Sequence, residues 1–179
     1  KNGELFKIIK FATMFKNSPN IGTGTITIKN DPRILPMGLF LRKTKINELP
    51  QLFNILKGEM SVIGPRPLTK QNFHNYSIET QKNIAQVRPG LSGIGSIVFR
   101  KEEDFLDEVS IKNNFYTKLI NYKGNLENWY IKNNDIYTYF SLIFLTIYIV
   151  LFPNSKIIWS FFKNVPKPPN ELEKYLNYF

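Results

Sequence analysis

A lone carboxylate, Glu48, stands among basic side chains in the stretch KTKINELPQLFNILKGEMSVIGPRP. Arg42 and Lys43 precede it, and Arg66 follows it. Arginine binds phosphate oxygens through two parallel hydrogen bonds, and a helix N-terminus adds N–H donors and a partial positive charge. These groups together would make a pyrophosphate pocket. The alternative is an ordinary set of solvated surface arginines.

Two of the arginines lie in turns that prolines and glycines define. Arg66 is locked between Pro65 and Pro67, so its side chain loses little entropy on binding. The alternative for Arg66 is a plain structural turn. Arg88 opens the glycine-rich stretch VRPGLSGIGS, residues 87–96, which matches neither the phosphate-binding loop nor the dinucleotide fingerprint. As an anonymous loop this stretch is therefore a weak signal.

The other polar residues also have ordinary interpretations. Glu48 in a first helical turn is normally a favourable placement of charge against the helix dipole, and Asn47 is normally an N-cap. His74 is interpreted as a surface or packing residue. The carboxylates of KEED, residues 101–104, could bind a divalent ion, but a solvated charge run is the preferred interpretation. The absence of cysteine excludes a disulfide framework, a thiolate nucleophile and a cysteine metal site.

The elements that must position these groups follow from the spacing of apolar residues and from breakers. We expect strands at 4–15 and 60–64, a short strand or extended edge at 25–29, and helices at 34–43, 47–57, 71–86, around 104–121 and at 124–133. In the helix 47–57, Pro50 falls in the first turn and Lys57-Gly58 is a stop signal. These elements predict a mixed, helix-rich α/β fold: a small monotopic membrane-associated domain with short strands and amphipathic helices.

The uncharged run IYTYFSLIFLTIYIVLF, residues 136–152, is near the lower limit of length for a membrane span. It is apolar on all sides, which favours a short span, a re-entrant segment or an interfacial helix over a buried core helix. The chain is therefore divided into a catalytic core at 1–135, an apolar membrane-associated helical segment at 136–165 and a proline-rich tail at 166–179.

A formal net charge of +10 predicts an acidic partner, namely nucleic acid, an anionic membrane surface or phosphorylated substrates. The lysines are scattered through apolar segments instead of forming one stripe, and no nucleic-acid-binding signature is present. We therefore expect no nucleic-acid partner. The oligomeric state does not follow from the sequence.

Four pieces in order resemble the bacterial sugar transferase family, the polyprenyl-phosphate hexose-1-phosphate transferases or monotopic phosphoglycosyl transferases. They are FKIIKFATM, DPRILPMGLFLRKTKINELPQLFNILKGEMSVIGPRPL, VRPGLSGIGS and NWYIKNNDIYTYFSLIFLTIY. The resemblance implies transfer of a sugar 1-phosphate from a nucleotide diphosphate sugar to a membrane polyprenyl phosphate. This step initiates synthesis of a surface polysaccharide or glycan, such as exopolysaccharide or lipopolysaccharide.

The resemblance also implies a location and a cofactor. The catalytic part would lie on the cytoplasmic face of the bacterial inner membrane and use Mg²⁺. A re-entrant membrane helix usually precedes this part in the family, so we expect that the chain was cut just upstream of Lys1.

The family's central helix opens with an Asp-Glu pair whose Asp forms a phosphosugar-enzyme intermediate. Glu48 matches the Glu, but Asn47 stands where the Asp is expected, and a neutral amide cannot be that nucleophile. Ala12 stands where a basic residue is usual. The resemblance implies that the diphosphate and the lipid phosphate are bound by Lys10, Arg42, Arg66 and Arg88.

Three accounts of Asn47 remain open. Glu48 attacks in its place, or the polyprenyl phosphate attacks directly with Glu48 as base or metal ligand, or the chain is an inactive membrane-bound homologue that binds nucleotide sugars or acts as a scaffold. We expect an active transferase. In it Glu48 is the catalytic or metal-coordinating carboxylate, and Asn47 caps the helix and hydrogen-bonds the substrate.

Overall fold

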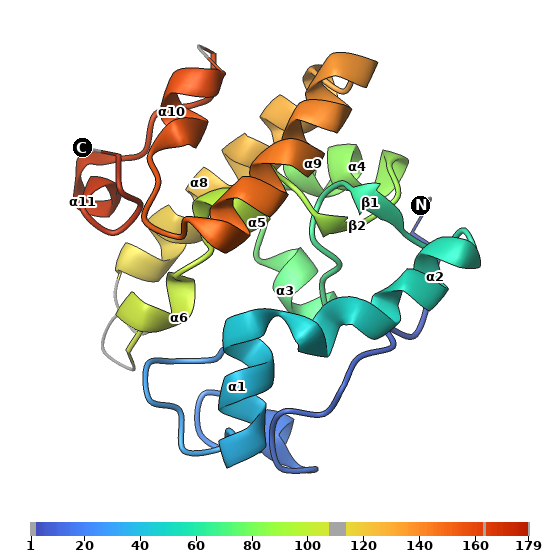
Figure 1. Cartoon of the computed structure of the whole chain (residues 1–179), viewed down its shortest axis with the longest axis vertical. Helices are drawn as coiled ribbons and strands as arrows, with labels where there is room; N and C mark the ends of the chain where they lie inside the picture. The colour runs from blue at the N-terminus through green and yellow to red at the C-terminus, as the bar shows by residue number, and fades with distance from the viewer. Residues whose placement is uncertain (1–2, 108–113, 163, 179) are drawn as a thin grey trace.

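The computed structural model describes residues 3–107, 114–162 and 164–178. Its first half contains η1 (Ser18–Asn20), α1 (Pro36–Thr44), η2 (Ile46–Gln51), α2 (Leu52–Leu56), β1 (Ser61–Ile63), α3 (Lys70–His74), α4 (Ile78–Gln86) and β2 (Gly90–Ser92). Its second half contains α5 (Ile94–Val98), α6 (Glu102–Phe105), α8 (Asn114–Lys132), α9 (Ile136–Leu151), α10 (Ile157–Phe161) and α11 (Asn170–Glu173). The expected mixed, helix-rich α/β fold is confirmed (Figure 1).

The described sheet has two short parallel strands, β1 and β2, with Ser61 opposite Gly90 and Ile63 opposite Ser92. The buried strand expected at 60–64 is confirmed, but the description of 87–96 as a loop is wrong, because β2 lies inside it. Gly90 allows this pairing, since a side chain there would overlap the backbone of Gly64. The pairing fixes where Arg66 emerges after β1.

The core lies where α8 and α9 cover the small sheet and α5. The helix α8 packs against α4 and α5, and α9 packs against α5 and β1. The fully buried side chains of this core include Ile94, Leu119, Leu126, Leu142, Leu145 and Leu172. The proposed division into core, apolar segment and tail stays a prediction.

The long helices begin and end at other residues than expected, because one expected helix is split and two expected pieces are joined. The helix expected at 71–86 is two helices, α3 and α4, because Ser77 caps a new helix by accepting a hydrogen bond from Thr80 N at 3.2 Å. Two helical pieces were expected, around 104–121 and 124–133, but α8 runs from Asn114 to Lys132 as one helix through Gly124. A side chain at Gly124 would press on Tyr76 and Thr80, so the glycine serves close helix packing. Residues 108–113 lie outside the described part.

The N-terminal segment 4–15 is extended, but the strand expected there is wrong. Its pairing with another segment is limited to one bridge, Met14 to Ile34, among the residues described. It binds instead along η2 and α2, where Asn54 accepts from Ile9 N at 3.0 Å and donates to Lys7 O at 2.9 Å. A high content of β-branched and aromatic residues predicted the strand, but it does not show that the segment binds the Asn54 side chain of a helix.

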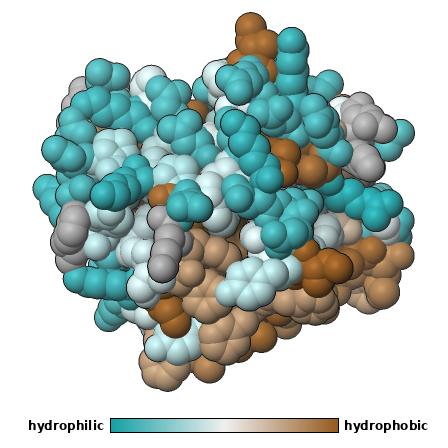
Figure 2. Space-filling model, turned by 90° about the horizontal axis from the view of Figure 1, so that it is seen from above, coloured by the Kyte–Doolittle hydropathy of each residue, from teal (hydrophilic) through white to brown (hydrophobic). Residues whose placement is uncertain are grey.

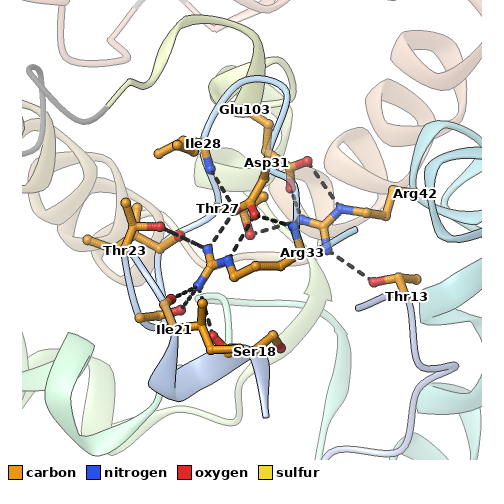
Figure 3. Close-up of polar contacts among 12 residues, drawn as sticks. Thr13, Ser18, Ile21, Thr23, Thr27, Ile28, Asp31, Arg33, Arg42 and Glu103 are labelled. Carbon is orange, nitrogen blue, oxygen red and sulfur yellow. Dashed lines mark hydrogen bonds and ion pairs between the residues drawn. The ribbon is translucent and has the colours of Figure 1, made fainter. Parts of the chain in front are cut away.

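Arg33 organises the loop between the N-terminal segment and α1 (Figure 3). It is buried and forms an ion pair with Asp31 at 2.6 Å. It also donates to Thr23 Oγ1 and to the carbonyls of Ser18, Ile21, Gly24 and Ile26, at 2.5–2.9 Å. The short strand or edge expected at 25–29 is loop held by this network. The loop's conformation therefore depends on one guanidinium.

The apolar run forms α9, a helix of 16 residues. One face is buried in the core and includes Leu142 and Leu145, whereas Phe140 and Phe144 on the other are 64% and 54% exposed. Along the ranges that the structure describes, no helix is both long and apolar enough to cross a membrane. The helix α9 is thus half core helix and half exposed apolar face.

Candidate functional site

The centre of the site is an ion pair between Glu48 and Arg66, with Arg66 Nη2 2.6 Å from Glu48 Oε1. Glu48 lies on η2, and Arg66 follows β1 in the turn with Pro65 and Pro67. The carboxylate side chain is 13% exposed, and the arginine side chain is 51% exposed. One partner is therefore sheltered while the other still reaches solvent, as a binding residue must.

Two lysines flank this ion pair through the backbone. Lys45 is placed because its carbonyl accepts from Glu48 N at 3.1 Å. Lys10 is placed because its neighbour Phe11 donates its N–H to Asn47 O at 3.0 Å. The N-terminal segment and η2 therefore bring two ammonium groups to the same carboxylate.

The charges in this cluster shift one another's pKa values. Burial alone would raise the pKa of Glu48, but Arg66, Lys45 and Lys10 together lower it, so the group is a carboxylate at neutral pH. Burial lowers the pKa of Lys45, with Arg66 adding to the effect and Glu48 opposing it. Partial withdrawal from water lowers the pKa of Lys10 in the same way, and Arg66 adds to it. A strongly cationic site thus surrounds one ionised acid.

Arg42 lies at the edge of the site and is held by several segments (Figure 3). It binds both carboxylate oxygens of Glu103 on α6, Thr13 Oγ1 at 3.2 Å and Thr27 Oγ1 at 3.1 Å. Glu103 therefore occupies the edge that Arg42 would offer to a phosphate. Arg42 joins the site, but it is already committed to protein partners.

The carboxylates of residues 101–104 are not grouped on a metal site. Glu103 pairs with Arg42, and Glu102 pairs with Lys123 at 2.6 Å. Within the described ranges, no group of three or more Asp, Glu, His or Cys residues is placed to hold a metal ion. Two of these carboxylates are neutralised in ion pairs, so the run is less solvated than expected.

Arg88 is not brought to the Glu48–Arg66 pair. It is exposed, and its guanidinium lies about a contact distance from Gly58, past the end of α2. The backbone of Arg88 lies beside Gly64, and the next strand residue, Gly90, donates its N–H to Pro65 O at 2.8 Å. The structure therefore brings Lys10, Arg42, Glu48 and Arg66 together, whereas the Arg88 side chain is directed to the end of α2.

Asn47 is not the helix N-cap that the sequence predicted. The element begins after Lys45, which is in the left-handed conformation with φ 60°, and Asn47 is the second residue of η2 and makes no capping hydrogen bond. The single α-helix expected at 47–57 is instead the 3-10 helix η2 followed by α2. The helix end predicted from Lys57-Gly58 is confirmed, because α2 ends at Leu56. Asn47 is buried, and its Oδ1 has no hydrogen-bond partner among the described residues.

The sequence profile of the bacterial sugar transferases matches residues 1–153 of this chain. The chain belongs to the bacterial sugar transferase family. It is 33% identical to an uncharacterized sugar transferase of Haemophilus influenzae and 30% identical to the undecaprenyl-phosphate galactose phosphotransferase of Salmonella typhimurium, covering 84% of this chain each time. It is 34% identical to the UDP-N-acetylgalactosamine-undecaprenyl-phosphate N-acetylgalactosaminephosphotransferase of Aeromonas hydrophila, again over 84% of this chain. The alignments cover 32%, 31% and 33% of these relatives, so the chain spans about a third of their length.

Two residues of this site were missed by sequence reasoning. Lys45 lies in the stretch 43–67. Its left-handed backbone, which turns η2 against the end of α1, cannot be predicted from the residue type. Glu103 was considered only as part of a charge run, since the pairing of α6 with Arg42 joins residues 61 apart in sequence. Neither could be found without the fold.

A third acidic residue, Glu127 on α8, is buried beside Gly95 of α5. Its Oε2 has no hydrogen-bond partner among the described residues, and a side chain at Gly95 would collide with its Oε1. Burial raises the pKa of Glu127 to about 8, although Lys123 and Arg66 oppose the shift. The titratable neighbours Tyr76 and Tyr130 have raised pKa values and stay neutral in the same range.

We predict that Glu127 makes the folded protein less stable as pH rises. Between about pH 4.5 and 8 the folded state keeps its proton and the unfolded state loses it. The free energy of unfolding therefore falls with rising pH, by at most about 1.4 kcal/mol per pH unit from this group. Urea unfolding measures the free energy of unfolding at pH 5 and at pH 8. The difference between the two values should be smaller for Glu127→Gln than for the unsubstituted chain. The exposed Glu79→Gln is the control, and equal slopes in all three proteins would contradict the prediction.

Proposed function

We propose that this chain transfers a sugar 1-phosphate from a nucleotide diphosphate sugar to a membrane polyprenyl phosphate. The observation that carries the proposal is the ionised Glu48, 2.6 Å from Arg66 and flanked by Lys10 and Lys45. This arrangement occurs in a chain of the bacterial sugar transferase family. The name of the Salmonella typhimurium relative supports the acceptor class, and the name of the Aeromonas hydrophila relative supports both a UDP-sugar donor and that acceptor.

The cationic side chains would do the work that phosphoryl transfer requires. Such reactions need positioning of the phosphates and stabilisation of the charge that builds on their oxygens. Arg66, held by its two prolines, would bind the diphosphate, and Lys10 and Lys45 would face it from the other side of Glu48. Arg42 would contribute after exchanging its bond to Glu103 for one to a phosphate.

We infer that the transfer is a direct displacement. The amide of Asn47 cannot attack phosphorus, and the Glu48 carboxylate is bound to Arg66 and has a lowered pKa, which weakens it as a nucleophile. An oxygen of the lipid phosphate would form the new bond to the phosphorus that carries the sugar. The bond from that phosphorus to the bridging oxygen would break, and the nucleoside monophosphate would leave with the electron pair.

The family resemblance implies Mg²⁺, and Glu48 is the carboxylate of the basic cluster that could share such an ion with substrate phosphates. Mg²⁺ commonly binds one or two carboxylates together with substrate phosphates. Glu48, sheltered beside the basic cluster, would hold it together with phosphate oxygens. Bound Mg²⁺ would supply charge neutralisation on the phosphates.

A membrane location on the cytoplasmic face of the bacterial inner membrane fits this acceptor. Figure 2 shows apolar side chains gathered along one edge of the molecule. Large exposed apolar side chains are frequent on α9 and from α1 to α2, and the net charge of +10 would attract anionic lipid. We propose that the outward face of α9 lies in the membrane interface.

We predict that replacing Phe140 and Phe144 by serine weakens binding to vesicles about 10-fold or more, because apolar area is lost from the interface. Flotation with vesicles that contain phosphatidylglycerol measures this. Ile78→Ser, at a 73% exposed position on α4, is the matched control. Equal flotation of all three proteins would contradict a role of α9 in membrane binding.

The transfer assay uses membranes that contain the chain, Mg²⁺, undecaprenyl phosphate and a panel of UDP-sugars labelled in the sugar. The proposal expects label in the organic phase with at least one donor and none when the lipid phosphate is omitted. No lipid-linked product from any donor would reject it. In that case Asn47 favours the second candidate, an inactive nucleotide-sugar-binding or scaffold homologue, and Asn47→Asp would be expected to switch transfer on.

A further inference from the structure

We propose that Lys45 binds a phosphate group of the ligand in this site. The inference rests on the proposed function in that it takes the site's ligand to be a phosphate ester or anhydride. It goes further because it assigns a contact to a residue outside the four basic positions that the resemblance implies.

The backbone of Lys45 is fixed where α1 ends and η2 begins. Its N–H donates to Arg42 O at 3.2 Å, and its carbonyl accepts from Glu48 N at 3.1 Å. Its φ of 60° is a left-handed conformation that glycine or asparagine adopts more readily. A lysine here carries a strain of about 1 kcal/mol. Such strained positions gather at sites of function.

The ammonium of Lys45 is not ion-paired with any carboxylate among the residues that the structure describes. Both carboxylates near it are committed to arginines, Glu48 to Arg66 and Glu103 to Arg42. Within the ranges that the structure describes, neither the Lys45 nor the Lys10 ammonium forms a hydrogen bond or an ion pair. A half-buried ammonium without a partner is costly, and a phosphate oxygen would satisfy its donors.

The cluster as a whole carries excess positive charge. Four cations (Lys10, Arg42, Lys45 and Arg66) face two carboxylates (Glu48 and Glu103), which leaves a net charge of +2. An anion with more than one negative charge, such as a diphosphate, complements this excess. The lowered pKa of Lys45 agrees with an ammonium that is withdrawn from water before its anion arrives.

The test compares Lys45→Met and Lys45→Arg with the unsubstituted chain, and Lys82→Met, at an exposed lysine of α4, is the control. Methionine is unbranched like lysine and shorter by only the terminal nitrogen, so the left-handed backbone stays equally strained. Calorimetry measures binding of two probes, UDP and farnesyl phosphate. Thermal unfolding without ligand reports on the fold.

We expect Lys45→Met to weaken binding of at least one probe about 10- to 100-fold, the usual range for a lost charged hydrogen bond. Lys45→Arg should stay within about 3-fold of the unsubstituted chain because it keeps the charge. Loss for UDP assigns the contact to the donor diphosphate, and loss for farnesyl phosphate assigns it to the acceptor. The melting temperature of Lys45→Met should be equal or higher, since an unpaired half-buried charge is removed.

Unchanged binding of both probes to Lys45→Met, or no binding of either to the unsubstituted chain at millimolar concentration, would overturn the inference. A lower melting temperature with unchanged binding would assign Lys45 to the fold instead. The transfer assay distinguishes a failure of the Lys45 inference from a failure of the proposed function. Lipid-linked product with unchanged probe binding rejects only the Lys45 contact, and lost probe binding without any product rejects only the transfer.

Discussion

Glu48→Gln is expected to lower the rate of sugar-phosphate transfer at least about 100-fold, within the range of losses found when one preorganised polar group of an active site is removed. Glutamine keeps the size of the side chain and a carbonyl that can accept from Arg66, so the fold and the position of η2 should be retained. What disappears is the negative charge that balances Arg66, Lys10 and Lys45 and that would hold Mg²⁺. The loss should therefore appear in kcat more than in the binding of the nucleotide.

The measurement is initial-rate transfer of labelled sugar to undecaprenyl phosphate at saturating Mg²⁺. Glu79→Gln, an exposed acid on α4, is the matched control and should keep the rate of the unsubstituted chain. If Glu48→Gln retains more than about half of the rate, Glu48 has no part in the chemistry, and the site must be sought elsewhere.

Arg33→Met is expected to lower the free energy of unfolding by about 3–5 kcal/mol, as when one partner of a buried ion pair is removed. Asp31, also buried, would lose the guanidinium that lowers its pKa, and its charge would be left without a counter-ion. The carbonyls of Ser18, Ile21, Gly24 and Ile26 would each lose a donor. Arg33→Lys keeps the charge but has fewer donors for these acceptors. Its free energy of unfolding should therefore lie between those of Arg33→Met and the unsubstituted chain.

Urea unfolding at pH 7 measures this effect, and Lys29→Met, at an exposed position of the same loop, should change stability by less than about 0.5 kcal/mol. A loss of under 1 kcal/mol for Arg33→Met would mean that the loop holds without its central guanidinium. The same loop carries Thr27, which binds Arg42, so Arg33 is a route by which the loop supports the site.

Where local patterns decide structure, the sequence predicted it well. The stop at Lys57-Gly58 and the buried strand 60–64 were both found because glycine and apolar runs act locally. The strand β2 was missed because a strand of three residues that begins with a glycine shows no periodicity. The segment 4–15 was misassigned because its partner is the Asn54 side chain, which no strand pattern encodes.

The residues of the site also fall into those that local patterns predict and those that depend on the fold. Residue type and turn chemistry pointed to Glu48 and Arg66, and the structure joins them in an ion pair. The direction of the Arg88 side chain and the presence of Lys45 in the site depend on how η2, α2 and the N-terminal segment are arranged in three dimensions. Asn47 was expected to cap a helix, but it lies inside a 3-10 turn because the left-handed Lys45 moves the start of the element. Such consequences of tertiary packing are invisible in composition and spacing.

A single-turnover reaction with a UDP-sugar labelled in the phosphate next to the sugar tests the account most directly. The protein, in excess over this donor, would be mixed with Mg²⁺ and undecaprenyl phosphate. The reaction would be quenched at early times and separated into lipid and protein fractions. We predict that the label passes to the lipid with no labelled protein at any time and that Glu48→Gln stops the transfer. Label that first appears on the protein, or that never reaches the lipid, would contradict direct displacement at Glu48.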